Sequence, residues 1–264
     1  MSVDYSQFQE VQVERRDRVL IVTLNRPKAL NAITFALHTE LSLLFRLMAR
    51  DGEALAVVLT GAGRAFCAGG DLKDFANPGE TQIDSLFEEA RTLITDILDL
   101  PQPLIAAVNG PAYGLGATLA LFADVILAAE EAVFADTHVV AGVVAGDGGA
   151  VIWPWLIGAA RAKEFLMTGD PITAKEAARI GLVNHALPAA ELMPRALAMA
   201  GRLAAGPKLA IQGTKQSVNQ LLRGAANQAL DLSLALEKAC FKSEDHVEAL
   251  KAFSEKRKPV FKGK

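Results

Sequence analysis

Short apolar runs alternate with polar or glycine-rich segments through the first half of the chain. The runs are rich in β-branched side chains and are bounded by polar residues or glycine, which is the pattern of buried strands. They are residues 18–24 (RVLIVTL), 55–60 (LAVVLT), 104–108 (LIAAV) and 125–129 (VILAA). We therefore expect four buried strands.

Segments with helical spacing separate the predicted strands. Apolar residues from Phe35 to Met48 recur every three or four positions after Thr34, a residue type that caps helices. Residues 116–122 read as a second, short and buried helix. Strand, glycine turn, helix and strand thus recur three times. This order predicts an α/β fold built from crossovers, with the binding edge in the loops that follow the strands.

The last third of the chain is predicted to be helical. We expect helices over residues 174–180, 192–205, 207–223 and 225–253, and an amphipathic helix earlier, over 83–98. We divide the chain into a core, residues 1–205, and a helical C-terminal region, residues 206–264. The apolar positions of that region either pack against another subunit or cover the core of the same chain.

Composition narrows the class of protein. The chain has 264 residues, 51% of them hydrophobic, so it can bury a large core. A net charge of −3 without a dominant basic face argues against nucleic acid as the main partner. The N-terminus lacks the features of a signal peptide, and no long apolar stretch occurs, so we expect a cytoplasmic protein with no membrane segment. The spacing of Cys67, Cys240 and the four histidines indicates neither a disulfide framework nor a metal site.

Two glycine-rich segments, residues 66–73 (FCAGGDLK) and 109–117 (NGPAYGLGA), each follow an apolar run. Glycine lets the backbone approach a ligand closely, and a backbone N–H that opens a helix is a ready anion site. Two such donors at one place form an oxyanion hole.

Several segments, in this order, resemble the crotonase (enoyl-CoA hydratase/isomerase) superfamily. They are residues 24–32 (LNRPKALNA), 66–73, 105–110 (IAAVNG) with the glycine loop that follows, and 167–170 (MTGD) with 174–177 (AKEA). The resemblance implies a spiral of ββα units with a helical C-terminal trimerisation region. It also implies a homotrimer or homohexamer, a dimer of trimers, that acts on acyl-CoA thioesters with no permanently bound cofactor.

The resemblance also assigns residues to the site. The backbone N–H groups of Gly70 and Leu115 would hold the thioester oxygen as it becomes negative. Coenzyme A would be bound by Lys28, Ala29, Leu30, Ala68, Gly70, Asp71, Leu72 and Phe261. The last of these belongs to a basic tail, residues 255–264, which matches the terminal segment that covers CoA in the family.

The chain departs from the hydratases at their two catalytic glutamates. Thr118 stands at one position and His138 at the other, so two-carboxylate hydration is in doubt. Asp147 follows nine residues after His138 in a glycine-rich loop that can fold back. A carboxylate that holds an imidazole N–H makes the ring a better base, so we expect His138, oriented by Asp147, to activate water. The alternative is a buried, backbone-bonded His138 with Asp147 as a helix cap.

Residues 146–148 (GDG) and 152–154 (IWP) also resemble the β-diketone hydrolase branch, which includes 6-oxocamphor hydrolase. There a His/Asp pair at this spacing activates water for retro-Claisen C–C cleavage, and CoA is not required. We predict an enzyme of the enoyl-CoA hydratase/isomerase family that hydrates or hydrolyses an acyl-CoA, with Thr118 and Leu115 in the substrate pocket. A CoA-independent retro-Claisen hydrolase and a catalytically silent CoA-binding protein are the alternatives.

Overall fold

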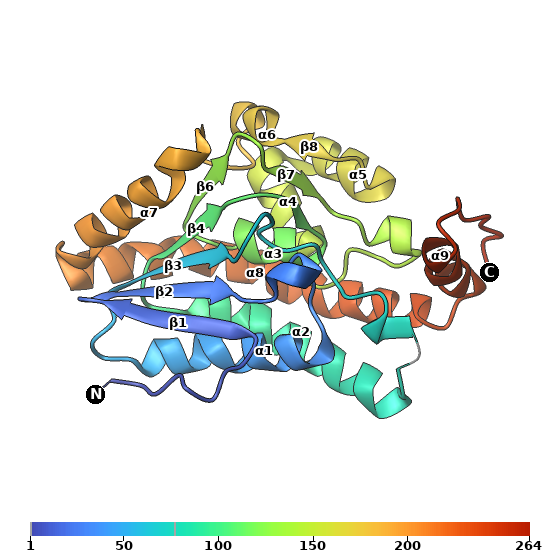
Figure 1. The fold of residues 1–264 in the computed structure, drawn as a ribbon, viewed down its shortest axis with the longest axis horizontal. Coiled ribbons are helices and arrows are strands. Elements are labelled where there is room, and N and C mark those ends of the chain that lie inside the picture. Colours follow the sequence, from blue (N-terminus) through green and yellow to red (C-terminus); the bar gives the residue numbers. More distant parts are fainter. Residues whose placement is uncertain (1, 77) are drawn as a thin grey trace.

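The computed structural model describes residues 2–76 and 78–264 (Figure 1). The strands are β1 (Val11–Arg16), β2 (Val19–Leu24), β3 (Ala56–Gly61), β4 (Leu104–Val108), β5 (Ala112–Tyr113), β6 (Val125–Ala129), β7 (Val133–Ala135), β8 (Ile172–Thr173) and β9 (His185–Leu187). The helices are α1 (Phe35–Arg50), α2 (Glu80–Asp99), α3 (Leu115–Leu121), α4 (Gly149–Ile157), α5 (Ala159–Thr168), α6 (Ala174–Ile180), α7 (Ala189–Ala204), α8 (Lys208–Cys240) and α9 (Glu244–Ser254). Short 3₁₀ turns lie at η1 (Pro27–Ala29), η2 (Asp74–Ala76) and η3 (Val139–Ala141).

A six-stranded sheet with the order β1-β2-β3-β4-β6-β9 forms the centre of the molecule. Only the β1–β2 pair within it is antiparallel, and β3 and β4 are buried along their whole length. Continuous apolar strands are typical of a parallel sheet that is covered on both faces. The arrowheads of β2 and β3 point toward the side of the molecule where α9 lies (Figure 1).

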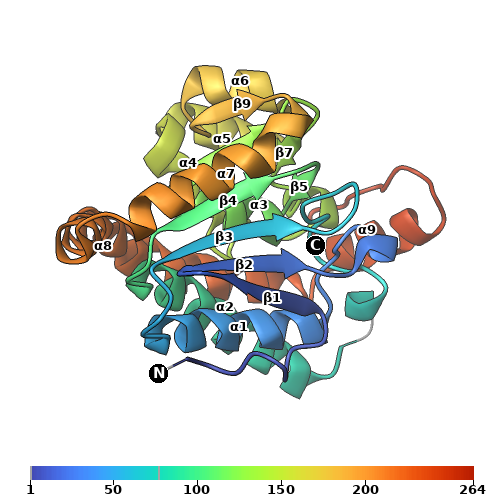
Figure 2. The same cartoon turned by 60° about the vertical axis from the view of Figure 1, so that its left-hand side comes forward.

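Helices cover the sheet in layers. Helix α7 contacts β2, β3, β4 and β6, while α1 and α2 pack together beneath the first strands (Figure 2). The long helix α8 contacts both α2 and α4. The apolar face of α1 includes fully buried Leu37, Leu41 and Phe45, and its N-terminus is closed by Thr34, whose Oγ1 accepts the N–H of Leu37 at 3.1 Å.

A second sheet with the order β5-β7-β8 stands beside the first. Its parallel β5–β7 pairing places Tyr113 opposite Ala135, and the N–H of Gly114 donates to the Ala135 carbonyl at 3.0 Å. The second glycine loop is thereby tied to the segment that leads into Asp136 and His138.

The α/β architecture, the four predicted strands and the helix after Thr34 are confirmed. Two expectations for the last third are wrong. Strand β9 interrupts the region expected to be entirely helical, and the helices expected on either side of Gly224 are one helix, α8, which ends at Cys240. Glycine in a helix costs about 1 kcal/mol relative to alanine. The apolar stripe that continues from Leu222 through Ala226 to Leu230 outweighs that cost.

Within the described part of the chain, no helix combines the length and the apolarity that crossing a bilayer requires.

Candidate active site

The two glycine loops lie side by side at the carboxyl ends of β3 and β4. The N–H of Tyr113 donates to the Cys67 carbonyl at 2.9 Å, and an ideal Cβ on Gly69 (φ +84°) would lie 3.0 Å from the Tyr113 carbonyl oxygen. A Cβ on Gly116 would lie 2.6 Å from both the Cβ and the carbonyl oxygen of Cys67. Glycine at these two positions therefore allows the loops to touch. Burial raises the pKa of the Cys67 thiol to about 12, so Cys67 is a packing residue rather than a nucleophile.

The backbone N–H groups of Gly70 and Leu115 are available to a ligand. Neither group donates a hydrogen bond to another atom of the described residues, and Leu115 is the first residue of α3, where an N–H has no partner within the helix. Both residues line the same cavity.

That cavity has a volume of about 750 Å³ and lies between the glycine loops, α2, α8 and α9. The residues predicted from the sequence that line it are Lys28, Ala29, Leu30, Ala68, Gly70, Asp71, Leu72, Leu115, His138 and Asp147. The structure places two predicted residues elsewhere. Thr118 is fully buried behind Asp147 and does not line the cavity. Phe261 is 47% exposed and also lies outside the cavity wall, to which the tail contributes Arg257 and Pro259.

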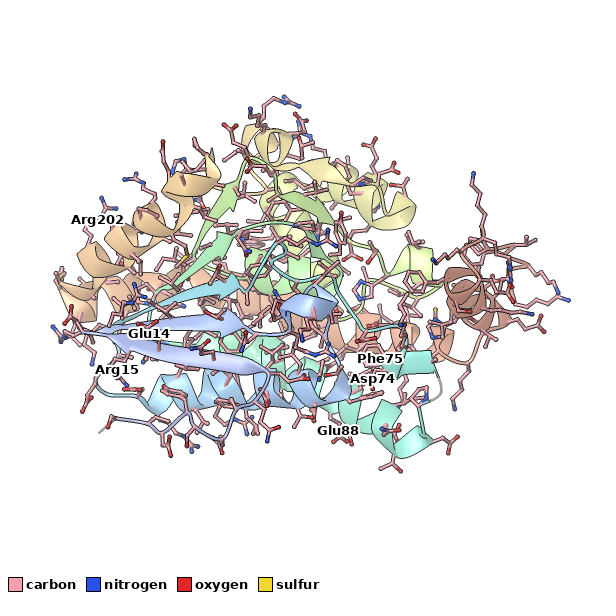
Figure 3. The ribbon with its side chains drawn as sticks, in the orientation of Figure 1. Glu14, Arg15, Asp74, Phe75, Glu88 and Arg202 are labelled. Atoms are coloured by element: carbon pink, nitrogen blue, oxygen red, sulfur yellow. The ribbon has the colours of Figure 1, made fainter. Side chains whose placement is uncertain are left out.

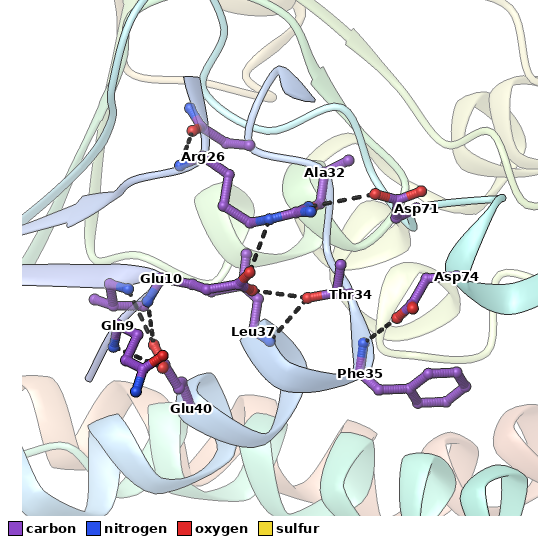
Figure 4. Close-up of polar contacts among 12 residues, drawn as sticks. Gln9, Glu10, Arg26, Ala32, Thr34, Phe35, Leu37, Glu40, Asp71 and Asp74 are labelled. Carbon is purple, nitrogen blue, oxygen red and sulfur yellow. Dashed lines mark hydrogen bonds and ion pairs between the residues drawn. The ribbon is translucent and has the colours of Figure 1, made fainter. Parts of the chain in front are cut away.

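Arg26 fixes the first loops of the cavity wall (Figure 4). Its Nε lies 3.0 Å from Glu10 Oε1, and its Nη1 lies 3.4 Å from Asp71 Oδ2 and donates to the Ala32 carbonyl. Asp71 thus lines the cavity while its carboxylate is paired with a cation. The carboxylate is therefore not a free negative charge at the site.

The turn η2 continues this wall (Figures 3 and 4). Asp74 Oδ2 accepts the N–H of Phe35 at 2.8 Å at the start of α1. Phe75 packs edge-on against the Phe35 ring, with ring centres 4.7 Å apart. A Cβ on Gly70 would lie 2.8 Å from the Phe75 ring, so the ring packs directly against the Gly70 backbone and only glycine fits there.

His138 lies between carboxylates on both ring nitrogens. Nδ1 is 2.7 Å from Asp136 Oδ1, and Nε2 is 3.1 Å from Asp147 Oδ2. Glu237 of α8 approaches from a third side, with Oε1 3.9 Å from Nε2. The far side of Asp147 is held by Thr118, whose hydroxyl donates to Oδ1 at 3.3 Å.

Burial and charge act in opposite directions in this cluster. Burial lowers the pKa of His138, but the negative charges of Asp147 and Asp136 outweigh it and raise that pKa well above 6.5. Burial raises the pKa of Glu237 well above 4.5; His138 opposes the shift, and the two aspartates add to it. The site therefore pairs an imidazole whose pKa is raised by neighbouring carboxylates with a carboxyl group whose pKa is raised by burial.

Neither Asp136 nor Glu237 was predicted from the sequence as a site residue. Asp136 stands two residues before His138, and an acid at that spacing after a strand was a usable signal. Glu237 lies about one hundred residues further along in an Ala- and Leu-rich helix, where only the packing of α8 brings it to the site.

Two further histidines line the cavity. His38 Nδ1 is 2.7 Å from Glu89 Oε2. His246 Nδ1 donates to the Ala141 carbonyl at 2.7 Å, and burial lowers the pKa of His246, so this ring is neutral near pH 7. The cavity thus carries polar groups away from His138 as well.

A sequence model of the enoyl-CoA hydratase/isomerase family matches residues 14–264. A probable enoyl-CoA hydratase of Rhodobacter capsulatus is 38% identical over 97% of this chain and 99% of its own length.

Solved structures agree in fold. An enoyl-CoA hydratase/isomerase of Mycobacterium paratuberculosis superposes with a TM-score of 0.91 at 36% identity, covering 94% of this chain and 99% of that one. A β-diketone hydrolase of the cyanobacterium Anabaena, bound to (S)-3-oxocyclohexyl acetic acid, superposes with a TM-score of 0.83 at 32% identity, covering 90% and 96%.

Proposed function

The chain belongs to the enoyl-CoA hydratase/isomerase family. We propose that it is an enzyme that binds an acyl-CoA thioester and uses an activated water to hydrate or hydrolyse the acyl group. The observation that carries this proposal is the position of His138. The ring lies in the wall of a cavity that also holds two free backbone N–H groups, Gly70 and Leu115.

The first element of the mechanism is the oxyanion hole. When hydroxide adds to the acyl group, or a base removes a proton beside the thioester, negative charge develops on the thioester carbonyl oxygen. The N–H groups of Gly70 and Leu115 would each donate to that oxygen, and loss of one such donor typically costs about 3 to 4 kcal/mol of transition-state stabilisation.

The second element is proton transfer from water. In its neutral form His138 accepts the water proton, and Asp147 stabilises the imidazolium that results. The hydroxide equivalent is then free to attack carbon. The raised pKa of His138 favours the proton transfer, but it also reduces the fraction of neutral base near pH 7.

Glu237 completes the proton balance. Glu237 lines the cavity, and burial raises its pKa, so its carboxyl holds a proton to a higher pH than an exposed glutamate does. In the proposed hydration this proton is delivered to the carbon beside the thioester carbonyl. Hydration would then place OH on one carbon of a double bond and H on its neighbour. His138 as the base and Glu237 as the acid would then take the two proton-transfer roles of the glutamates that the chain lacks at the positions of Thr118 and His138.

Retro-Claisen hydrolysis of a β-diketone is the second candidate. The similarity to the Anabaena β-diketone hydrolase and the His138–Asp147 contact favour it. In this reaction the activated water adds to a ketone, the C–C bond breaks to leave an enolate, and the enolate takes up a proton. The polar wall groups His38 and His246 would suit a diketone better than a plain alkyl chain.

One experiment separates these functions. Binding of CoA and crotonyl-CoA is measured by the shift in melting temperature, and products are analysed after incubation with crotonyl-CoA and with a cyclic β-diketone. Hydration of crotonyl-CoA supports the first function, and diketone cleavage without a CoA-induced shift supports the second. Binding of CoA with neither product leaves a silent CoA-binding protein.

We also propose that residues 206–264 form the contacts of a homotrimer or homohexamer. This region carries exposed apolar side chains, among them Leu221 (65% exposed), Leu232 (63%) and Leu236 (49%) on α8. Apolar surface that one chain leaves uncovered favours association with further copies.

A further inference from the structure

The two carboxylates on His138 are not equivalent. Asp147, His138 and Glu237 line the cavity, whereas Asp136 does not and is fully buried. Asp136 therefore acts on the imidazole from the side that faces away from any substrate, and Asp147 acts from the side that faces it.

Asp136 is held at a fixed point of the fold. It directly follows β7, whose last residue, Ala135, accepts the N–H of Gly114 at 3.0 Å. Its Oδ1 also accepts the backbone N–H of His138 at 3.3 Å, so backbone and ring are bonded to the same carboxylate oxygen. A Cβ on Gly149 would lie 2.3 Å from Asp136 Oδ2, so glycine at the start of α4 is needed to make room for the carboxylate.

A carboxylate can only accept, so a neutral imidazole donates its single proton to one of the two aspartates. The 2.7 Å contact of Nδ1 with Asp136 is shorter than the 3.1 Å contact of Nε2 with Asp147, which favours the proton on Nδ1. The 3.1 Å contact between Nε2 and Asp147 contains a second proton when His138 is charged. Of the two, only the Nε2 proton lies on the cavity side.

We propose that Asp136 is the positioning residue of this site: it keeps Nδ1 protonated in every state, so that Nε2 is the single atom through which His138 exchanges protons with the cavity. Asp147 shares that proton, and Thr118 holds Asp147 in place. This inference deepens the proposed function, because it identifies the proton-accepting atom of the water-activating base.

Three acidic groups face His138: Asp136 from the end of β7, Asp147 from the loop before α4, and Glu237 from α8. Removing the charge of Asp136 leaves the groups on the cavity side unchanged. Asp136→Asn keeps an oxygen that can accept the Nδ1 proton but loses the negative charge. The variant therefore separates the charge of Asp136 from its shape.

The test is a ¹⁵N-histidine NMR titration of the full-length protein without substrate. The chain has four histidines, and His138→Gln identifies the signals of residue 138. In the wild type, Nδ1 should remain protonated throughout, and Nε2 should lose its proton. In Asp136→Asn the midpoint should fall by about 1 to 3 pH units, the range for a neighbouring opposite charge.

Asp170→Asn, at an exposed aspartate, is the matched control and should leave the midpoint unchanged. A neutral His138 that carries its proton on Nε2 in the wild type overturns the inference, and so does an Asp136→Asn midpoint equal to that of the wild type. If Asp136→Asn does not fold, the wild-type tautomer alone decides. Because no substrate is present, these results stand whether or not the protein acts on CoA thioesters.

Discussion

A single methyl group at Gly116 tests whether contact between the two glycine loops builds the oxyanion hole. Gly116 lies in α3, one residue after Leu115, and faces Cys67 of the first loop. In Gly116→Ala the new Cβ would lie 2.6 Å from the Cys67 Cβ and carbonyl oxygen and 2.7 Å from its Sγ. The carbonyl oxygen belongs to the backbone and cannot rotate away, so the two loops must separate.

The expected magnitudes follow from that contact. Overpacking in a close-packed interior costs about 1 to 3 kcal/mol of unfolding free energy. Separation of the loops also moves the N–H of Leu115 relative to that of Gly70. Loss of one oxyanion donor lowers kcat by about 10²- to 10³-fold, and we expect a reduction of this order.

The assay combines urea unfolding with steady-state kinetics. The kinetics are measured well below the melting temperature, so that a loss of activity cannot be caused by unfolding of the variant. Gly224→Ala is the matched control. Gly224 lies within α8, and a Cβ added there would meet no atom within 4 Å outside its own helical turns, so this change should stabilise the protein by about 0.4 to 1 kcal/mol. Wild-type stability and turnover in Gly116→Ala would refute the argument.

Further predictions concern the acid–base cluster and the assembly. His138→Ala and Asp147→Asn should each lower kcat about 10²- to 10⁴-fold with KM nearly unchanged. The double variant should be little slower than His138→Ala, because the pair acts as a unit; Thr118→Ala, which removes only a 3.3 Å bond to Asp147, should cost far less. In a pH–rate profile, kcat should fall as the pH drops through a midpoint above 6.5, since the pKa of His138 is raised and only the neutral ring accepts a proton; a profile without this acid limb would contradict the assignment. The pKa of Glu237 is higher in the folded protein than its value near 4.5 in the unfolded chain, so the folded state binds this proton more tightly. The resulting stability is fully present below the unfolded pKa and is lost as the pH rises through the folded pKa. Glu237→Gln should therefore unfold at higher urea than the wild type at about pH 8 and at a similar urea concentration at about pH 4, and equal stability at both pH values would argue against a protonated Glu237. Sedimentation should show a trimer or hexamer, and a monomer at micromolar concentration would rule out the proposed interface.

Local patterns in the sequence predicted the parts of the fold that local physics determines. The apolar runs of β2, β3, β4 and β6 and the cap at Thr34 depend on neighbouring residues alone. The break expected at Gly224 was wrong because tertiary packing of the stripe around Leu222 and Ala226 outweighs the low helix propensity of glycine.

In the site, too, the local sequence predicts some contacts, and tertiary packing alone creates others. His138 and Asp147 lie nine residues apart in one glycine-rich loop, so their spacing alone suggested a pair. Glu237 reaches the site only through the packing of α8, and no spacing along the chain indicates that contact. The role of Asp136 depends on which ring nitrogen it faces, and that orientation follows from the backbone at the end of β7.

The position of helix α8, between the active site and the exposed apolar surface, links activity to protein concentration. Leu236 is 49% exposed and its neighbour Glu237 is 6% exposed, so consecutive residues face solvent and His138. One turn earlier, the Ser233 hydroxyl donates to the carbonyl of Gly146, beside Asp147, at 2.9 Å. A second subunit seated on Leu236 would restrict the motion of the same turn that holds Glu237 and the Asp147 loop. Specific activity would then fall when the enzyme is diluted below the dissociation constant of the assembly, and added inactive subunits would restore it.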